Sequence, residues 1–524
     1  ATGKFYNLTF NGSGGAWSFT SNPTVEIANN FTNSAGTVTS TSGNLIIGGN
    51  ASMKSFLGGF THNSGTVTLN ATTGGHVLTN SGSGGYTLYN LVFDGVGGAW
   101  TFDAGNETVI IDNNFTITNG SVTVGSHLFI KNNYSNSGTF TAGTYYSVIF
   151  NATDGGNTLA GTLSGSSKFY RLQFNGVGGS WSFTSNPAVE VGDDFTIVNG
   201  TVTSTSNTLT ITGNYSNSGT FTHNNGTVTM NATDAGNTMA GTLSGTTGKF
   251  YNLTFNGVGG AWSFTSNPNL EITNNFTITA GTVTATNIYL YGNYSNSGTF
   301  THNNKTIYIR GTSKTLSGNM SGTSAFLSMW FDTGGTNSFT GGTDVEFSGD
   351  YYITGGSTVT STSANLIAKG DFTISNGLFQ HNNGTVSFNK VGSQSFFIFN
   401  GGATSFYNIT ITSSVSTAGT TFFTIDNNFT ISSGTFLAGN DLLIKGNYSN
   451  SGTYTNNSKT VTFAATDAGN TLAGNLSGTS KFYNLVFNGV AGAWSFTSNP
   501  AVEVANDLTI TNGTLTPETY TILN

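Results

Sequence analysis

Acidic residues are the first candidates for chemistry, because a glycosidase needs two carboxyl groups with different roles on one face of the protein. In this sequence the acids recur at intervals and do not cluster. One set occupies a slot between two apolar residues and the other follows the sequence AAT or NAT: Glu26, Glu190, Glu271 and Glu503, and Asp154, Asp234 and Asp467. A residue copied from repeat to repeat is explained by the scaffold, so we predict no catalytic residue and no enzymatic activity.

Histidine, the commonest metal ligand, is repeated in the same way. Four histidines occupy one position in the sequences FTHN or FQHN and two stand apart: His62, His223, His302 and His381, then His76 and His127. Equivalent residues are a whole repeat apart, which favours surface or corner histidines, and we predict no metal site. The DAGN and DNN turns leave room for an occasional structural calcium ion, although the GGxGxDx repeat of calcium-loaded β-rolls is absent. We predict no other cofactor.

Lysines precede several of the repeated glutamates at a fixed distance. Lys4, Lys168, Lys249 and Lys481 each lie 22 residues before a repeated Glu. An alignment of the expected strands places Glu271 beside Thr254, about five residues along from Lys249. The alignment therefore predicts that these lysines and glutamates do not pair.

The sequon N-x-S/T is the one modification signal that is frequent here. The chain contains about two dozen instances, and about 19 would arise by chance from its content of Asn, Ser and Thr. Sequons of the NFT and NYS type fall at repeated turns, which an export-linked glycosyltransferase could reach. We expect partial N-glycosylation, with these candidate acceptors: Asn7, Asn30, Asn114, Asn133, Asn214, Asn252, Asn275, Asn293, Asn428 and Asn447.

Composition excludes several classes of partner. The chain has 14 Lys and Arg against 22 Asp and Glu, a net charge of −8 and no basic run, so we predict no nucleic-acid binding. No apolar run approaches the roughly 18 residues that a bilayer requires, so we predict no membrane insertion. Cysteine is absent, which removes disulfides and thiol chemistry. Aromatic residues make up 13%, which argues against disorder despite 73 glycines.

These residues are carried by an imperfect repeat that extends over the whole chain. An anchor of the FYNL type recurs about every 76 to 83 residues: Tyr6, Tyr89, Tyr170, Tyr251, Leu327, Tyr407 and Tyr483. We therefore predict one continuous repetitive body over residues 1–524, with approximate modules 1–83, 84–164, 165–245, 246–321, 322–401, 402–477 and an incomplete 478–524.

Within each module, pairs of apolar residues flank a polar one, as in Leu253-Thr254-Phe255. This period of two is typical of strands with one buried face, and successive pairs lie about 17–25 residues apart, the length of one solenoid coil. Glycine-rich turns separate the pairs, and no segment has helical periodicity. The pattern predicts an all-β, right-handed parallel β-solenoid (β-helix) of about 26 coils, four coils per module. The recurring tryptophans are expected in its core or corners.

The phrases GNYSNSGTFTHNNGTVTMNAT (213–233) and KFYNLTFNG (249–257) resemble the β-solenoid repeat region of large secreted surface proteins. These proteins are the filamentous-haemagglutinin-like adhesins of bacteria and similar fibre or sheath proteins of archaeal surfaces. The resemblance covers essentially the whole chain. It implies export, a fibrous shape and a role in adhesion or assembly.

Together these features predict an extracellular, cell-surface structural protein of a filament, sheath or stalk. We expect self-association through unblocked solenoid ends, head to tail. The alternative is a surface adhesin whose flank binds glycans or another cell, and its best candidate is the divergent stretch 311–350 with Met320, Met329, Trp330 and Phe331. A drifted module is the preferred interpretation of that stretch. A polysaccharide-acting β-helix enzyme is a remote third alternative.

Overall fold

The strands expected from the repeat are present throughout the part of the chain that the computed structural model describes, residues 3–54, 59–80, 85–103, 108–399, 404–419, 422–517 and 522–523. The fold is an all-β parallel solenoid of about 22 turns with about 22 residues per turn, which confirms the predicted fold class and is close to the predicted number of coils. Helix is confined to four short 3-10 segments in the described residues: η1 (Gly165–Ser167), η2 (Gly245–Thr247), η3 (Gly322–Ser324) and η4 (Gly478–Ser480).

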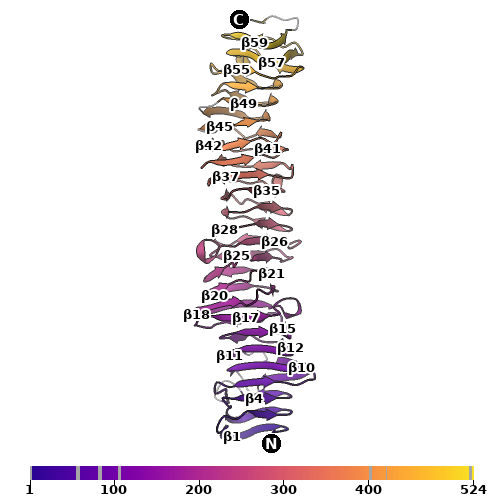
Figure 1. Cartoon of the computed structure of the whole chain (residues 1–524), viewed down its shortest axis with the longest axis vertical. Helices are drawn as coiled ribbons and strands as arrows, with labels where there is room; N and C mark the ends of the chain where they lie inside the picture. Colours follow the sequence, from indigo (N-terminus) through magenta and orange to yellow (C-terminus); the bar gives the residue numbers. More distant parts are fainter. Residues whose placement is uncertain are drawn as a thin grey trace. The chain divides into compact units, whose positions relative to one another are not determined.

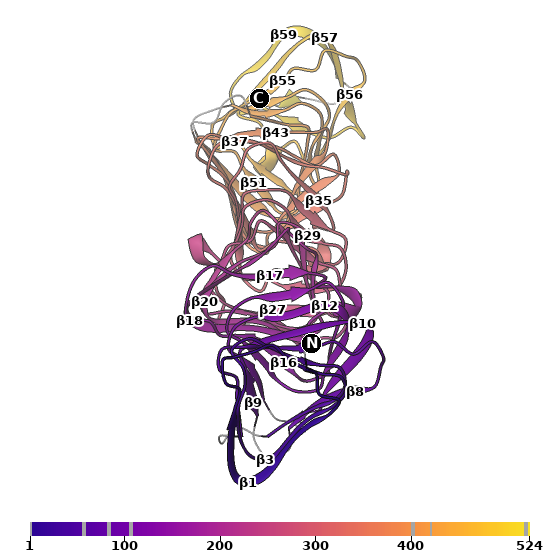
Figure 2. The ribbon, with the colours of Figure 1, turned by 60° about the horizontal axis from the view of Figure 1, so that its bottom comes forward.

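The chain forms two compact units, Ala1–Glu271 and Ile272–Asn524, and each is described by itself. In the first unit, coloured indigo to magenta in Figure 1, parallel strands stack turn upon turn. Figure 2 brings the first turns of this unit forward, where β1 (Leu8–Ser18) pairs in parallel with β3 (Phe31–Thr39).

Each turn of the first unit has three strand positions. The long strand β10 (Asn90–Asp103) bends and supplies two of them, and β11 (Val109–Ile111) supplies the third. The next turn then begins with β12 (Phe115–Val124), in which Phe115 pairs with Leu91 and Val122 with Trp100, while β13 (Leu128–Ile130) pairs with β11. The solenoid of this unit therefore has three faces.

Aligned residues trace these faces from turn to turn. The first face runs through Val25, Leu45, Val67, Leu91, Phe115, Tyr134 and Leu159. The second runs through Tyr86, Val109, Leu128, Val148, Leu172, Phe195, Tyr215 and Met239. The third runs through Phe31, Ala51, Leu78, Phe102 and Val124. All of these side chains are buried, so the three faces enclose a continuous core in this unit.

The module and the turn have different lengths, and the module therefore rotates around the solenoid. Leu91 of one anchor lies on the first face and its equivalent Leu172, 81 residues later, lies on the second. Leu253, after another 81 residues, aligns with Val228 and belongs to neither of these two ladders. A module contains about eleven strand positions and each turn uses three, so a module covers about three and two-thirds turns. This is about a third of a turn less than the four coils per module that the sequence predicted.

Alternation of side chains explains why these short segments are strands. In β24 (Thr227–Met230) Val228 and Met230 are buried, and Thr227 and Thr229, which alternate with them, face outward. Aromatic rings of neighbouring turns stack inside the core, as Phe115 and Tyr134 do with ring centroids 5.6 Å apart. Large inward side chains supply most of the favourable burial, and outward Thr suits the pleated surface.

Tryptophan occupies the core in four modules, as expected: Trp100, Trp181, Trp262 and Trp494 are each 1% exposed. Each ring lies over glycines that come a few residues earlier in the same turn. A Cβ added at Gly179 would lie 2.5 Å from the ring of Trp181 and 2.3 Å from the carbonyl oxygen of Ala152. The second glycine of the GG pair is therefore required by this close approach.

The second unit, from magenta through orange to yellow in Figure 1, repeats the same construction. One of its ladders runs through Ile288, Ile307, Met329, Tyr351, Phe372 and Phe396. Another runs through Val345, Leu366, Val386, Ile409, Phe429, Tyr448 and Leu472. A third runs through Phe423, Leu442, Val461 and Leu485.

Candidate functional site

The repeated lysines and glutamates form ion pairs across one turn. Nζ of Lys168 lies 3.2 Å from Oε1 of Glu190, and the equivalent distances are 2.8 Å for Lys4 and Glu26, 4.0 Å for Lys249 and Glu271, and 3.0 Å for Lys481 and Glu503. The other oxygen of Glu190 accepts the N–H of Gly165, the first residue of η1, at 3.0 Å. The glutamate therefore holds both a lysine and a 3-10 turn of the preceding coil.

The prediction that these residues do not pair is wrong. It placed Glu271 beside Thr254, but the N–H of Phe250 donates to the carbonyl oxygen of Glu271 at 2.9 Å. The strand of Thr254, β26 (Asn252–Phe255), lies one position further along the chain than the bridge formed by Phe250. The signal for the pair was present in the sequence, because 22 residues is the length of one turn.

The repeated aspartates close turns. The amide nitrogen of Asn157 donates to the carbonyl oxygen of Asp154 at 2.8 Å and faces its carboxylate at 3.5 Å. Asn237 makes the same contacts with Asp234, and Asn470 with Asp467. Each aspartate is thus engaged within its own turn, three residues from its partner.

The repeated histidines also support turns. In His62, Nδ1 accepts the N–H of Ser64 at 2.9 Å, and Nε2 lies 3.1 Å from Oδ2 of Asp112. Because Nδ1 is the acceptor, the proton of the neutral ring is on Nε2 and is donated to Asp112. Its ring stacks on Tyr89 with centroids 5.5 Å apart, and Lys131 contacts the second oxygen of Asp112 at 2.7 Å. Both ring nitrogens are occupied, which leaves none to accept a proton from a substrate or to bind a metal.

The same arrangement recurs in the second unit. Nε2 of His381 lies 3.0 Å from Asp426, its ring contacts Tyr407, and Lys445 lies 2.7 Å from the same carboxylate. Burial alone would raise the pKa of Asp426, but Lys445, Ser405 and His381 outweigh burial and lower it. His–Tyr contacts of this kind were not anticipated from the sequence, although three of the four repeated histidines, His62, His223 and His381, precede an anchor tyrosine by a little more than one turn.

The other two histidines of this set keep only part of the arrangement. Nδ1 of His223 accepts the N–H of Asn225 and Nδ1 of His302 accepts the N–H of Asn304, each at 3.0 Å. Burial, followed by the nearby charge of Lys249, lowers the pKa of His223. The shared feature of all four histidines is therefore the turn that each one closes.

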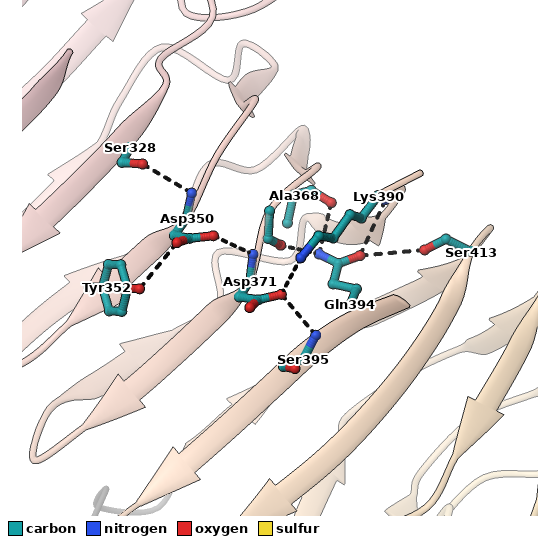
Figure 3. Close-up of polar contacts among 10 residues, drawn as sticks. Ser328, Asp350, Tyr352, Ala368, Asp371, Lys390, Gln394, Ser395 and Ser413 are labelled. Carbon is teal, nitrogen blue, oxygen red and sulfur yellow. Dashed lines mark hydrogen bonds and ion pairs between the residues drawn. The ribbon is translucent and has the colours of Figure 1, made fainter. Parts of the chain in front are cut away.

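Carboxylates of the second unit link successive turns in the same manner (Figure 3). Oδ1 of Asp350 accepts the N–H of Asp371 at 2.9 Å, and Oδ1 of Asp371 accepts the N–H of Ser395 at 3.0 Å and contacts Nζ of Lys390 at 2.7 Å. Burial raises the pKa of Asp371, but Lys390 and the N–H of Ser395 outweigh it, so the net shift is downward. Gln394, fully buried beside them, donates to carbonyl oxygens of the preceding turn.

Most of the sequon asparagines expected as glycan acceptors lie in ladders between turns. Asn7 is exposed, and the others are partly buried: Asn30, Asn114, Asn133, Asn214, Asn252, Asn275, Asn293, Asn428 and Asn447. In a typical ladder, Nδ2 of Asn133 donates to Oδ1 of Asn114 at 2.9 Å. These asparagines therefore contribute to the contacts that hold the turns together.

The divergent stretch 311–350 continues the solenoid. Met320, Met329 and Phe331 are buried in its core. Trp330 faces outward between Tyr308 and Tyr352, with ring centroids 6.0 and 4.2 Å away. A polar pocket of about 400 Å³ lies in the same stretch, and its walls include Asn319, Ser321, Thr323, Thr343 and Asp344.

No group of three or more His, Cys, Asp or Glu side chains within the described ranges is placed to hold a metal ion. The described residues also contain no helix with the length and apolar character needed to cross a membrane. Comparisons with family models, curated proteins and solved structures find no match. Function must therefore be argued from the contacts of the chain itself.

Proposed function

We propose that this protein is an extracellular structural protein that belongs to a cell-surface filament, sheath or stalk. One observation carries the proposal: its charges are used to join turns. At least ten of the 14 Lys and Arg residues pair with a carboxylate one turn away: Lys4, Lys131, Lys168, Arg171, Lys249, Arg310, Lys369, Lys390, Lys445 and Lys481.

The outer surface supports the same proposal. Only 7% of residues are charged, and threonine and asparagine face outward on the strands and turns, so solubility depends on hydroxyl and amide groups. Each exposed ion pair adds at most about 1 kcal/mol, but pairs repeated along a stacked fold add a contribution at every interface between turns where one occurs. Such repetition is suited to a persistent scaffold.

We further propose that the protein has no enzymatic activity. The repeated glutamates each accept a hydrogen bond from a lysine or a glycine N–H, and the repeated aspartates are bound within their turns. An acid and base pair needs two carboxyl groups about 5–10 Å apart and open to substrate. The contacts of these acids favour a structural role instead.

Self-association is the proposed mode of assembly. The last turn of any parallel solenoid has strand edges with unpaired N–H and C=O groups, and a second copy with the same turn geometry can pair with them. The resulting filament would continue the ladders of one copy into the next. Sedimentation and negative-stain electron microscopy of the purified protein test this step, and dispersed single copies at high concentration would contradict it.

Labelling of intact source cells tests the location. Gold-conjugated antibodies against the protein should mark fibres or a layer outside the cell envelope, without permeabilisation. Label that appears only after the cells are opened would contradict the proposal. Cells that lack the protein provide the control for antibody specificity.

A surface adhesin is the second candidate, and the polar pocket of the stretch 311–350 favours it. Hydroxyl and amide groups around a carboxylate are groups that bind sugar hydroxyls. Oδ1 of Asp344 already accepts the N–H and the amide of Asn365 at 3.1 and 3.0 Å. Binding to a glycan array that Thr323→Trp abolishes, and that Thr222→Trp, an exposed threonine outside the pocket lining, preserves, would support this candidate.

A further inference from the structure

Two structural classes stand out among the sequon asparagines of the described residues. In the first class, the asparagine bridges turns with both ends of its amide. Nδ2 of Asn133 donates to Asn114, and its Oδ1 accepts the N–H and the hydroxyl of Thr158, each at 2.8 Å. The same double contact recurs at Asn214, Asn293 and Asn447.

The ladder explains why these sequons exist. The asparagine is needed for the contacts between turns, and the Ser or Thr two residues later occupies the outward position of the strand that follows, as Ser135 does in β14 (Tyr134–Asn136). A sugar on Nδ2 would have to fit between strands about 4.8 Å apart. Ladder sequons are therefore closed to glycan attachment once the turns have stacked.

The second class lies at the tips of the turns that the repeated histidines close. Asn225, Asn304 and Asn383 are exposed and have positive φ of 56, 55 and 57°. The backbone N–H of each donates to the histidine two residues earlier. No side-chain hydrogen bond of these three asparagines is present among the described residues, in contrast to the double contacts of the first class.

We propose that Asn225, Asn304 and Asn383 are the preferred N-glycan acceptors of the folded protein, and that the ladder asparagines are not modified. The donor is a lipid-phosphate-linked oligosaccharide, used by its transferase. The amide nitrogen attacks the anomeric carbon; an N–C bond forms, the C–O bond to phosphate breaks, the amide loses a proton and the lipid phosphate leaves. The proposal rests on the proposed extracellular location, where such a transferase is met.

The chain contains its own controls. The equivalent turn after His62 has Asn63, Ser64 and Gly65, so it has the same shape but no sequon. In the equivalent turn of a later module, Asn456 takes the place of the histidine and begins a sequon. Nδ2 of Asn456 donates to the carbonyl oxygen of Lys481 at 3.0 Å, and its Oδ1 accepts the N–H of Ser458. Asn456 should remain unmodified although it lies only two residues from Ser458, which occupies the turn-tip position.

The test uses the purified, folded full chain with a purified oligosaccharyltransferase and a lipid-linked donor. Glycopeptide mass spectrometry then gives the occupancy of each sequon. We expect glycans at the three turn-tip asparagines and none at Asn133, Asn214, Asn447 and Asn456. A proteolytic digest of the same chain, modified in parallel, should lose this selectivity because the ladders are gone.

Two results would overturn the proposal. One is equal occupancy of ladder and turn-tip sequons in the folded chain. The other is modification of the turn-tip peptides in the digest but not in the folded protein. The matched variants Asn225→Gln and Asn133→Gln give a second readout, since only the first should remove a glycan from the intact mass. Because this reaction is carried out in vitro, a negative result counts against the choice of acceptor sites. A wrong extracellular location would be detected separately, by the labelling of intact cells.

Discussion

Nζ of Lys168 lies 3.2 Å from Oε1 of Glu190 on the next turn, and the second oxygen of that glutamate binds the N–H of Gly165. The two residues are 22 positions apart, and the same pair recurs in three other modules. A single carboxylate thus joins a side chain and a backbone turn of the preceding coil.

This geometry predicts unequal effects of removing the two partners. Lys168→Ala should cost less than about 1 kcal/mol, because the side chain is 48% exposed and water screens the pair. Glu190→Ala should cost about 1 kcal/mol more, because the N–H of Gly165 also loses its acceptor. Hydrogen exchange of the residues near η1 measures both, and equal losses would show that the contact with Gly165 contributes nothing.

The asparagine ladder predicts a local loss of stability. Asn133→Ala should cost about 1–3 kcal/mol near this turn, since the N–H of Thr158 and the amide of Asn114 lose a partner. Faster exchange of the Thr158 N–H is the expected signal. Asn114→Asp is the matched control and should be nearly neutral, because Asp194 fills the equivalent place below Asn214. A large effect of the control would contradict the ladder as the cause.

Buried tyrosines offer a substitution that should not destabilise. The hydroxyl of Tyr215 is fully buried with no hydrogen-bond partner in the described part of the chain, and burial raises its pKa. Removing an unpaired buried hydroxyl is neutral or stabilising, by up to about 1 kcal/mol. Tyr215→Phe should therefore keep or raise the unfolding midpoint in urea, whereas Tyr215→Ala should lower it through a cavity. A marked loss for Tyr215→Phe would reveal a partner of the hydroxyl.

Acid should loosen the second unit near Asp426. The folded pKa of this carboxyl is lowered from its ordinary value of 3.8, because Lys445, Ser405 and His381 outweigh the opposing effect of burial. A carboxyl with a lowered pKa contributes stability that is fully present above its unfolded pKa and is lost as pH falls through the folded pKa. Hydrogen exchange around His381 should accelerate below about pH 3.8.

The variant Asp426→Asn separates this effect from general acid unfolding. It removes the titrating group while keeping the size of the side chain, so the part of the pH dependence due to this carboxyl should disappear. Lys445 and His381 are the charged or titratable groups that contact the carboxylate. An unchanged pH profile in this variant would assign the acid sensitivity to other carboxyls, such as Asp371.

The alternation of side chains was enough to predict the strands and the core. Leu253 and Phe255 are buried on either side of an outward Thr254, as their spacing indicates. The same holds for the tryptophans and for the approximate length of a turn. Both features are local, because a period of two and a turn signal can be read from a few consecutive residues.

Register was not available from these local patterns. The pairing of Phe250 with Glu271 depends on which strand of the neighbouring turn lies beside it, and a shift of one strand position moved Lys249 away from its true partner in the predicted alignment. The stacking of His62 on Tyr89 was missed for the same reason.

By itself, the sequence determined which side chains face inward and that the same unit recurs, because both depend on the order of residues along one strand. The tertiary structure decided that three strands make a turn, so that Leu91, Leu172 and Leu253 of successive modules belong to different ladders. It also decided which charged side chains form ion pairs. Paired residues lie about 22 positions apart in the sequence, because that is the number of residues in one turn around the core.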